Sequence, residues 1–129
     1  MKIAALIARY LLGLIFLVFG LNGFFHFIPQ GPLPGGPAGQ FIGALFVSHY
    51  LVFVFLLQII PAILLLLNRF VPLAVALLAP IIVNIFLFHA LMSPSGLPLA
   101  LVVIVLWCVV AYSVRSAFEG VFKHRHHQV

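Results

Sequence analysis

Long apolar runs, separated by short polar or Pro/Gly-rich breaks, dominate the sequence. Four of these runs approach the roughly 20 residues that a helix needs to cross the hydrocarbon layer of a membrane. They cover residues 5–27, 50–67, 71–90 and 97–114. The pattern therefore predicts an all-α membrane protein with four transmembrane helices.

A Pro- and Gly-rich segment at residues 29–39 separates the first two runs, and this composition excludes a continuous helix there. Residues 40–47 are apolar again. Joining them to the second run would give a helix of about 28 residues, roughly 42 Å, which is long for a bilayer. We expect instead a short interfacial helix over about 38–47, with a break at residues 48–50.

The placement of Lys and Arg predicts the topology. Short links at residues 68–70 and 92–96 make successive helices antiparallel neighbours. With four crossings, all six cations fall on one side: Lys2, Arg9, Arg69, Arg115, Lys123 and Arg125. Cytoplasmic segments are enriched in Lys and Arg, so both termini are expected in the cytoplasm and the interfacial helix outside. The predicted units are a bundle at residues 1–118 and a basic, His-rich tail at residues 119–129.

Composition narrows the class of protein. Apolar residues make up 66% of the chain and charged residues 5%, whereas a soluble domain carries about 25% charged residues. A soluble globule and a disordered chain are both excluded, and the bilayer of the inner (plasma) membrane is the expected environment. The net charge of +5 reflects six cations against one acid, without the basic face that nucleic-acid binding requires. The single Cys108 excludes an intrachain disulfide and is expected to pack as a small buried residue.

The tail offers two features. Arg115, Glu119 and Lys123 are spaced by four, which predicts a helical continuation with ion pairs along one face. A run of histidines near the C-terminus could bind a metal, but a solvated segment near anionic headgroups is the better interpretation for His124, His126 and His127.

Polar side chains inside the spans mark candidate sites, because each needs a partner in lipid. They are Asn22, His26, His49, Gln58, Asn84 and His89. In the predicted topology the histidines and asparagines of this set gather in the outer half of the bundle, and Gln58 lies near the middle of the second span. Asn84 and His89 are five residues apart, roughly 140° around a helix, so only one can face inward unless the helix distorts. Pro80 offers such a distortion.

Small residues predict where helices approach closely. Gly13, Gly20 and Gly23 suit close packing of the first span. The third span carries a stripe of small and kinking residues at a spacing of four: Pro72, Ala76, Pro80 and Asn84. This stripe favours close packing of the third span against a neighbouring helix.

Three interpretations of the polar set stay open. The side chains could bridge helices, they could line an outward pocket for a quinone-like amphipathic molecule, or some histidines could ligate metal or haem. Histidine exchanges protons near neutral pH, which suits proton-coupled redox chemistry. Haem is the weakest option, because no His-x₃-His pair or Cys partner accompanies the histidines. No Asp or Glu lies in a span, which removes a carboxylate proton relay, and no nucleophilic triad is present.

Five short motifs stand out: RYLLGLIF at residues 9–16, FGLNGF at 19–24, HFIP at 26–29, NRFVPL at 68–73 and APIIVNIFLFH at 79–89. Their order and spacing resemble the DoxX family of small membrane proteins, over most of residues 5–120. The resemblance implies a four-helix membrane bundle. The family is named for a subunit linked to thiosulfate:quinone oxidoreduction, and relatives are associated with membrane oxidoreductase complexes and thiol stress.

The resemblance also points to residues. It implies Asn22, His26, Asn84 and His89 as candidate pocket residues. Many relatives carry a Glu and a Gly-Gly pair in the second span, where this chain has Gln58 and Pro61-Ala62. If that Glu handles protons, this chain lacks its activity.

Two functional hypotheses follow. The first is a subunit or accessory of a quinone-linked oxidoreductase system with an outward polar pocket and a redox partner subunit. The second is a non-enzymatic scaffold, chaperone or small-molecule transporter whose polar residues lock helices together. The sequence leaves the ligand, any catalytic activity and a homo-oligomeric state open.

Overall fold

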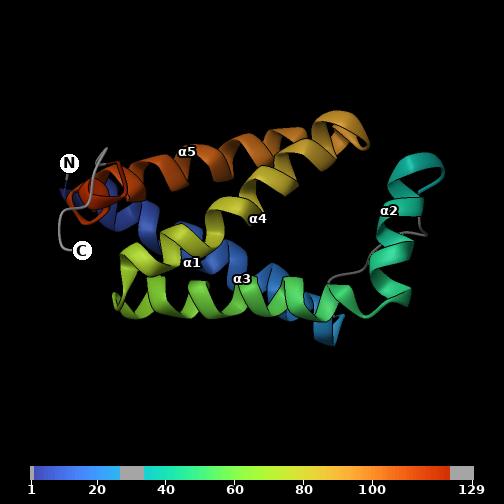
Figure 1. Cartoon of the computed structure of the whole chain (residues 1–129), viewed down its shortest axis with the longest axis horizontal. Helices are drawn as coiled ribbons and strands as arrows, with labels where there is room; N and C mark the ends of the chain where they lie inside the picture. The colour runs from blue at the N-terminus through green and yellow to red at the C-terminus, as the bar shows by residue number, and fades with distance from the viewer. Residues whose placement is uncertain (1, 27–33, 123–129) are drawn as a thin grey trace, which may run out of the picture.

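The structure, a computed structural model, describes residues 2–26 and 34–122. These residues form only helices (Figure 1): α1 Lys2–Phe25, α2 Gly36–Val47, α3 Tyr50–Leu67, α4 Val71–Leu91, η1 Pro94–Gly96, α5 Leu97–Ser113 and η2 Arg115–Phe122.

Within the described ranges, four helices are long and apolar enough to cross a membrane: α1, α3, α4, and η1 continued into α5. They contain 18 to 24 residues, or roughly 27 to 36 Å at the rise of an α-helix. The hydrocarbon layer is about 30 Å thick. The prediction of an all-α protein with four membrane-length helices is confirmed, and the chain is a multi-pass membrane protein.

The four long helices pack as a ring in which α1 and α4 each contact both α3 and α5. The interior is filled by side chains that are almost completely buried, among them Leu12, Leu65, Leu78 and Val110. Many other large apolar side chains point outward and are exposed. That arrangement fits a bundle whose outer surface contacts lipid tails, because apolar residues need no burial there.

Glycines bring α1 and α3 together. A Cβ atom on Gly20 would lie 2.7 Å from Cγ1 of Ile59, and one on Gly23 would lie 2.4 Å from the Phe55 ring. At Gly13 it would lie 3.2 Å from the backbone oxygen of Ala62. The contacts at Gly20 and Gly23 are closer than a Cβ atom permits, and the contact at Gly13 is tight, in agreement with the close packing expected of the first span.

Left-handed backbone conformations mark the breaks between helices. His49 has φ 64° and separates α2 from α3, at the predicted break. Asn68 (φ 54°) ends α3 and Phe70 (φ 51°) precedes α4. The Arg69 N–H donates to the Leu64 carbonyl at 3.0 Å, which satisfies one of the last carbonyls of α3.

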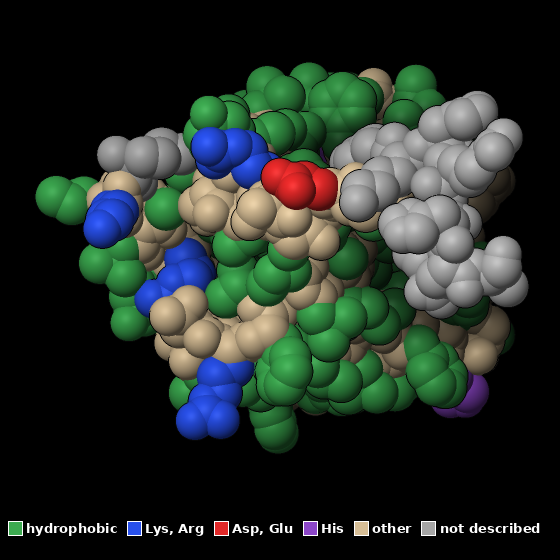
Figure 2. Space-filling model, turned by 60° about the vertical axis from the view of Figure 1, so that its left-hand side comes forward, with side chains coloured by type: hydrophobic (Ala, Val, Ile, Leu, Met, Phe, Trp, Pro, Cys, Tyr) green, Lys and Arg blue, Asp and Glu red, His purple; other side chains and the backbone are tan. Residues whose placement is uncertain are grey.

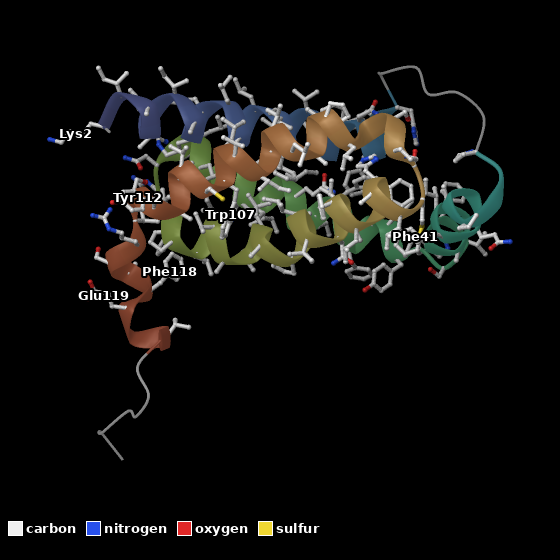
Figure 3. The ribbon with its side chains drawn as sticks, turned by 90° about the horizontal axis from the view of Figure 1, so that it is seen from above. Lys2, Phe41, Trp107, Tyr112, Phe118 and Glu119 are labelled. Carbon is white, nitrogen blue, oxygen red and sulfur yellow. The ribbon has the colours of Figure 1, made fainter. Side chains whose placement is uncertain are left out.

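The two ends of the bundle differ. α2 lies across one end (Figure 1), where the Phe41 ring meets the Phe88 ring of α4 at 5.7 Å. Ala38 is the buried residue of α2. Lys2 and Glu119 lie at the opposite end (Figure 3), and Figure 2 shows several Lys and Arg side chains spread over this face, one of them beside the acidic side chain. The start of α1 and η2, the last described segment, lie at this cationic end (Figure 1).

Two packing expectations were wrong. The α4 stripe faces outward, since Ala76, Pro80 and Asn84 are exposed. The Asn84 amide donates to the Pro80 carbonyl of its own helix at 2.8 Å, so it needs no neighbouring helix. The face of α4 that packs in the core instead carries bulkier side chains, including Val75 and Leu78. Cys108 is exposed rather than buried.

The expected α-helical continuation of the last span was also wrong. α5 ends at Ser113, and Arg115–Phe122 forms a 3-10 helix. With three residues per turn, positions four apart do not share a face. Accordingly, the Arg115 guanidinium donates to the Tyr112 carbonyl at 2.8 Å. No ion pair joins it to Glu119 in the part of the chain described.

Candidate functional site

A cavity of about 360 Å³ lies between the four long helices. Its walls come from residues 15–23 of α1, 55–58 of α3, 85–89 of α4 and 99–103 of α5. These stretches belong to the halves of the helices that approach α2. The cavity is therefore in the part of the bundle remote from the cationic end.

Three polar side chains enter this cavity from three different helices: Asn22 from α1, Gln58 from α3 and His89 from α4. Asn22 is 2% exposed and Gln58 8% exposed. The remaining walls are mainly aromatic and aliphatic, with Phe16, Phe19, Phe55, Ile85, Leu99 and Val103 among them. A site of this composition suits a molecule that is largely apolar and carries a few hydrogen-bonding atoms.

Gln58 presents an amide to the cavity that no described residue hydrogen-bonds. The side chain lies in the middle of α3, and Gly20 of α1 packs against its Cβ. A primary amide offers both a carbonyl acceptor and two N–H donors. Because this amide reaches the cavity, a ligand or a water molecule there can hydrogen-bond it.

His89 is held in one orientation by the turn that follows α4. Its Nδ1 lies 3.1 Å from the Ser93 carbonyl oxygen. A carbonyl can only accept, so Nδ1 carries the proton in this bond. The ring also meets the Phe88 ring edge-on at 5.2 Å. A Cβ atom on Gly96 would lie 2.2 Å from the imidazole, so only glycine leaves room for the ring there.

Asn22 lies near the end of α1. Its backbone carbonyl accepts the His26 N–H at 2.8 Å, and His26 has φ 52°. His26 thus takes the left-handed conformation that commonly ends a helix. The side chain of Asn22 is thereby fixed on the last turns of α1, beside the cavity.

The other three predicted site residues lie outside this cavity. His26 and His49 are exposed residues at helix ends, both with a left-handed backbone. Asn84 is exposed on α4 and bonds its own helix. The structure thus brings together Asn22, Gln58 and His89 from the six residues that the sequence singled out.

Metal ligands are not clustered in the described part of the chain: no three His, Cys, Asp or Glu side chains there could hold an ion together. The tail histidines, His124, His126 and His127, lie outside the described residues.

The sequence did not predict several contacts that join helices or hold a cavity residue in place. Arg9 donates to the Leu65 carbonyl across α1 and α3, and Trp107 Nε1 donates to the Val75 carbonyl at 3.0 Å across α5 and α4. Ser93 and Gly96 hold His89. Only Arg9 gave a signal, as the one charge within an apolar run.

A second hollow, of about 260 Å³, lies between α4 and α5 and includes Trp107 and Cys108 in its lining. It is almost entirely apolar, and the indole N–H of Trp107 is already bonded to Val75. A ligand in this hollow would therefore find apolar contacts but no hydrogen-bonding side chain, unlike a ligand in the cavity lined by Gln58 and His89.

Compared with protein-family models, curated proteins and solved structures, the chain matches none of them. The resemblance to the DoxX family accordingly rests on the motifs at residues 9–16, 19–24, 26–29, 68–73 and 79–89 alone.

Proposed function

We propose that this membrane protein binds a quinone-like amphipathic molecule in the cavity between its four long helices. In this proposal it serves as a subunit or accessory of a quinone-linked oxidoreductase system, as the resemblance to the DoxX family implies. The observation that carries the proposal is the meeting of Gln58 and His89, from two helices, in an otherwise mostly apolar cavity.

The size and chemistry of the cavity support this ligand class. Its volume of about 360 Å³ is at the lower end of the roughly 300–1,000 Å³ found for small-molecule sites. Phe16, Phe19 and Phe55 offer apolar contact to an aromatic ring, while Gln58 and His89 offer hydrogen bonds to ring oxygens. Because Gln58 is an amide where relatives carry Glu, the proton-exchanging group in this proposal is His89.

The proposal includes a membrane orientation. The helices run antiparallel through the inner (plasma) membrane, with both termini in the cytoplasm and the cavity in the outer half. Support comes from the cations among the described residues: Lys2 and Arg9 lie in the first turns of α1, Arg69 lies between α3 and α4, and Arg115 begins η2. Lys and Arg are enriched at the cytoplasmic ends of membrane proteins, and Figure 2 shows side chains of this kind on one face of the molecule. A reporter fused to the C-terminus tests this: a fluorescent protein fused there should fold and glow, and a periplasmic phosphatase should stay inactive.

A partner subunit belongs to the proposal. Oxidising or reducing a quinone takes two electrons, and a second redox group must supply or receive them. We place that redox group on a partner protein of the same complex, and this chain would contribute the quinone site to the complex.

Binding of 1,4-naphthoquinone to the purified protein in nanodiscs tests the proposal. The wild type should bind it, and organic extraction of the purified protein should release a bound membrane quinone. Gln58→Leu and His89→Leu should weaken binding, roughly tenfold for each strong hydrogen bond lost. Gln40→Leu on exposed α2 and Asn84→Leu on exposed α4 are matched controls and should bind as the wild type does.

The second candidate is a scaffold, chaperone or small-molecule transporter, in which polar groups join helices. The bonds from Arg9 to Leu65 and from Trp107 to Val75 favour it, since each joins two helices. Under this alternative, the cavity variants would lose stability and none of the proteins would bind a quinone.

A further inference from the structure

The orientation of His89 has a consequence for the chemical form of the ligand. Its Nδ1 is engaged by the Ser93 carbonyl at 3.1 Å, which leaves Nε2 as the ring nitrogen for a ligand. In the neutral ring with a proton on Nδ1, Nε2 has no proton and can only accept.

The turn that sets this state is well fixed. The Ser93 N–H donates to the Phe88 carbonyl at 3.1 Å, and the Gly96 N–H donates to the Ser93 carbonyl at 3.3 Å. The Ser93 oxygen therefore accepts from both Gly96 and His89, which uses its two lone pairs. The contact of Gly96 with the imidazole leaves the ring little freedom to turn over.

We propose that the turn Ser93–Gly96 fixes His89 as a hydrogen-bond acceptor, so that the cavity selects a ligand with a hydroxyl donor over its carbonyl counterpart. For a quinone-like ligand this means that the hydroquinone binds more tightly than the quinone. The inference rests on the proposed function, because it concerns the same cavity. Gln58 does not discriminate, since its amide can donate to a carbonyl and accept from a hydroxyl equally well.

Equilibrium dialysis under argon with 1,4-naphthoquinone and with 1,4-dihydroxynaphthalene, both against the full-length protein in nanodiscs, tests the inference. The dihydroxy form should bind roughly three- to tenfold tighter, which corresponds to one net hydrogen bond. In His89→Gln the new amide both donates and accepts, so the preference should disappear. In Gly96→Ala the added methyl should displace the ring and weaken the preference, while Gly43→Ala, where an added Cβ meets nothing within 4 Å, should retain it.

A spectroscopic measurement reads the same state without a ligand. In protein labelled with ¹⁵N-histidine, the imidazole signals that vanish in His89→Gln should show a protonated Nδ1 and an unprotonated Nε2. The opposite tautomer, or a quinone that binds as tightly as the dihydroxy form, would overturn the inference and leave the proposed function standing. Absence of binding by both forms would overturn the proposed function itself.

Discussion

The guanidinium of Arg9 in α1 donates a hydrogen bond to the backbone carbonyl of Leu65 in the last turn of α3. Arg9 is 9% exposed and also lies over the Tyr10 ring, 4.5 Å from its centroid. The last carbonyls of a helix lack partners within the helix and carry partial negative charge. A buried cation on α1 thus completes the end of α3 and joins the two helices.

Replacing Arg9 should therefore destabilise the bundle. Arg9→Met keeps most of the side-chain volume and removes the charge-assisted bond, with an expected loss of about 1.5–3 kcal/mol in the free energy of unfolding. Reversible unfolding in mixed micelles, followed by circular dichroism, measures it.

Arg115→Met is the matched control. Arg115 also lies over an aromatic ring and donates to a carbonyl, but both belong to Tyr112 of its own segment. We expect a change within about 0.5 kcal/mol, as is usual for exposed groups. Equal losses in the two variants would contradict the role assigned to Arg9.

The close approach of α1 and α3 predicts coupling between Gly20 and Ile59. An added Cβ at Gly20 would lie 2.7 Å from Ile59 Cγ1, so Gly20→Ala should destabilise by about 1–3 kcal/mol through overpacking. Ile59→Ala removes the obstructing atom. In a double-mutant cycle the pair should recover at least about 1 kcal/mol relative to the sum of the single changes. Additive effects would show that the helices are not in contact at this point.

Trp107 joins α5 to α4 through its bond to Val75. Trp107→Phe keeps an aromatic ring and removes the donor, so the free energy of unfolding should fall by about 0.5–1.5 kcal/mol, with some further loss of packing. Tyr112→Phe is the control, because it removes the hydroxyl of an exposed ring on the same helix. Unfolding should be followed by circular dichroism, because Trp107 is the one tryptophan of the chain and its replacement removes the tryptophan fluorescence signal.

Much of the fold was predictable from the order of apolar runs and breaks. The predicted spans at residues 50–67, 71–90 and 97–114 differ by at most one residue at either end from α3, α4 and α5. The first span begins three residues earlier than predicted, because Lys2 can extend from a helix end without entering the lipid. The separate short helix α2 and the break at His49 were predictable from length, since one continuous helix would exceed the bilayer.

The site was predictable only as a set of polar residues, because hydropathy does not say which way each one points. Asn84 and His89 are five residues apart on α4, and the sequence left open which faces inward. The structure turns His89 to the cavity, and Asn84 bonds its own backbone outside. Nothing in the sequence around Ser93 and Gly96 indicates that these two residues hold the His89 ring. Their effect depends on a turn that brings them back onto His89, which is a tertiary contact.

Substitution of Gln58 is the most direct test of the account, because the two functional hypotheses predict opposite results for one variant. If the amide serves a ligand, Gln58→Leu should leave the free energy of unfolding unchanged or raise it by about 1 kcal/mol, since the amide that reaches the cavity, which no described residue hydrogen-bonds, is replaced by an apolar side chain of similar volume. The same variant should bind 1,4-naphthoquinone roughly tenfold more weakly than the wild type. A variant that is less stable than the wild type and binds the quinone as tightly would contradict the account.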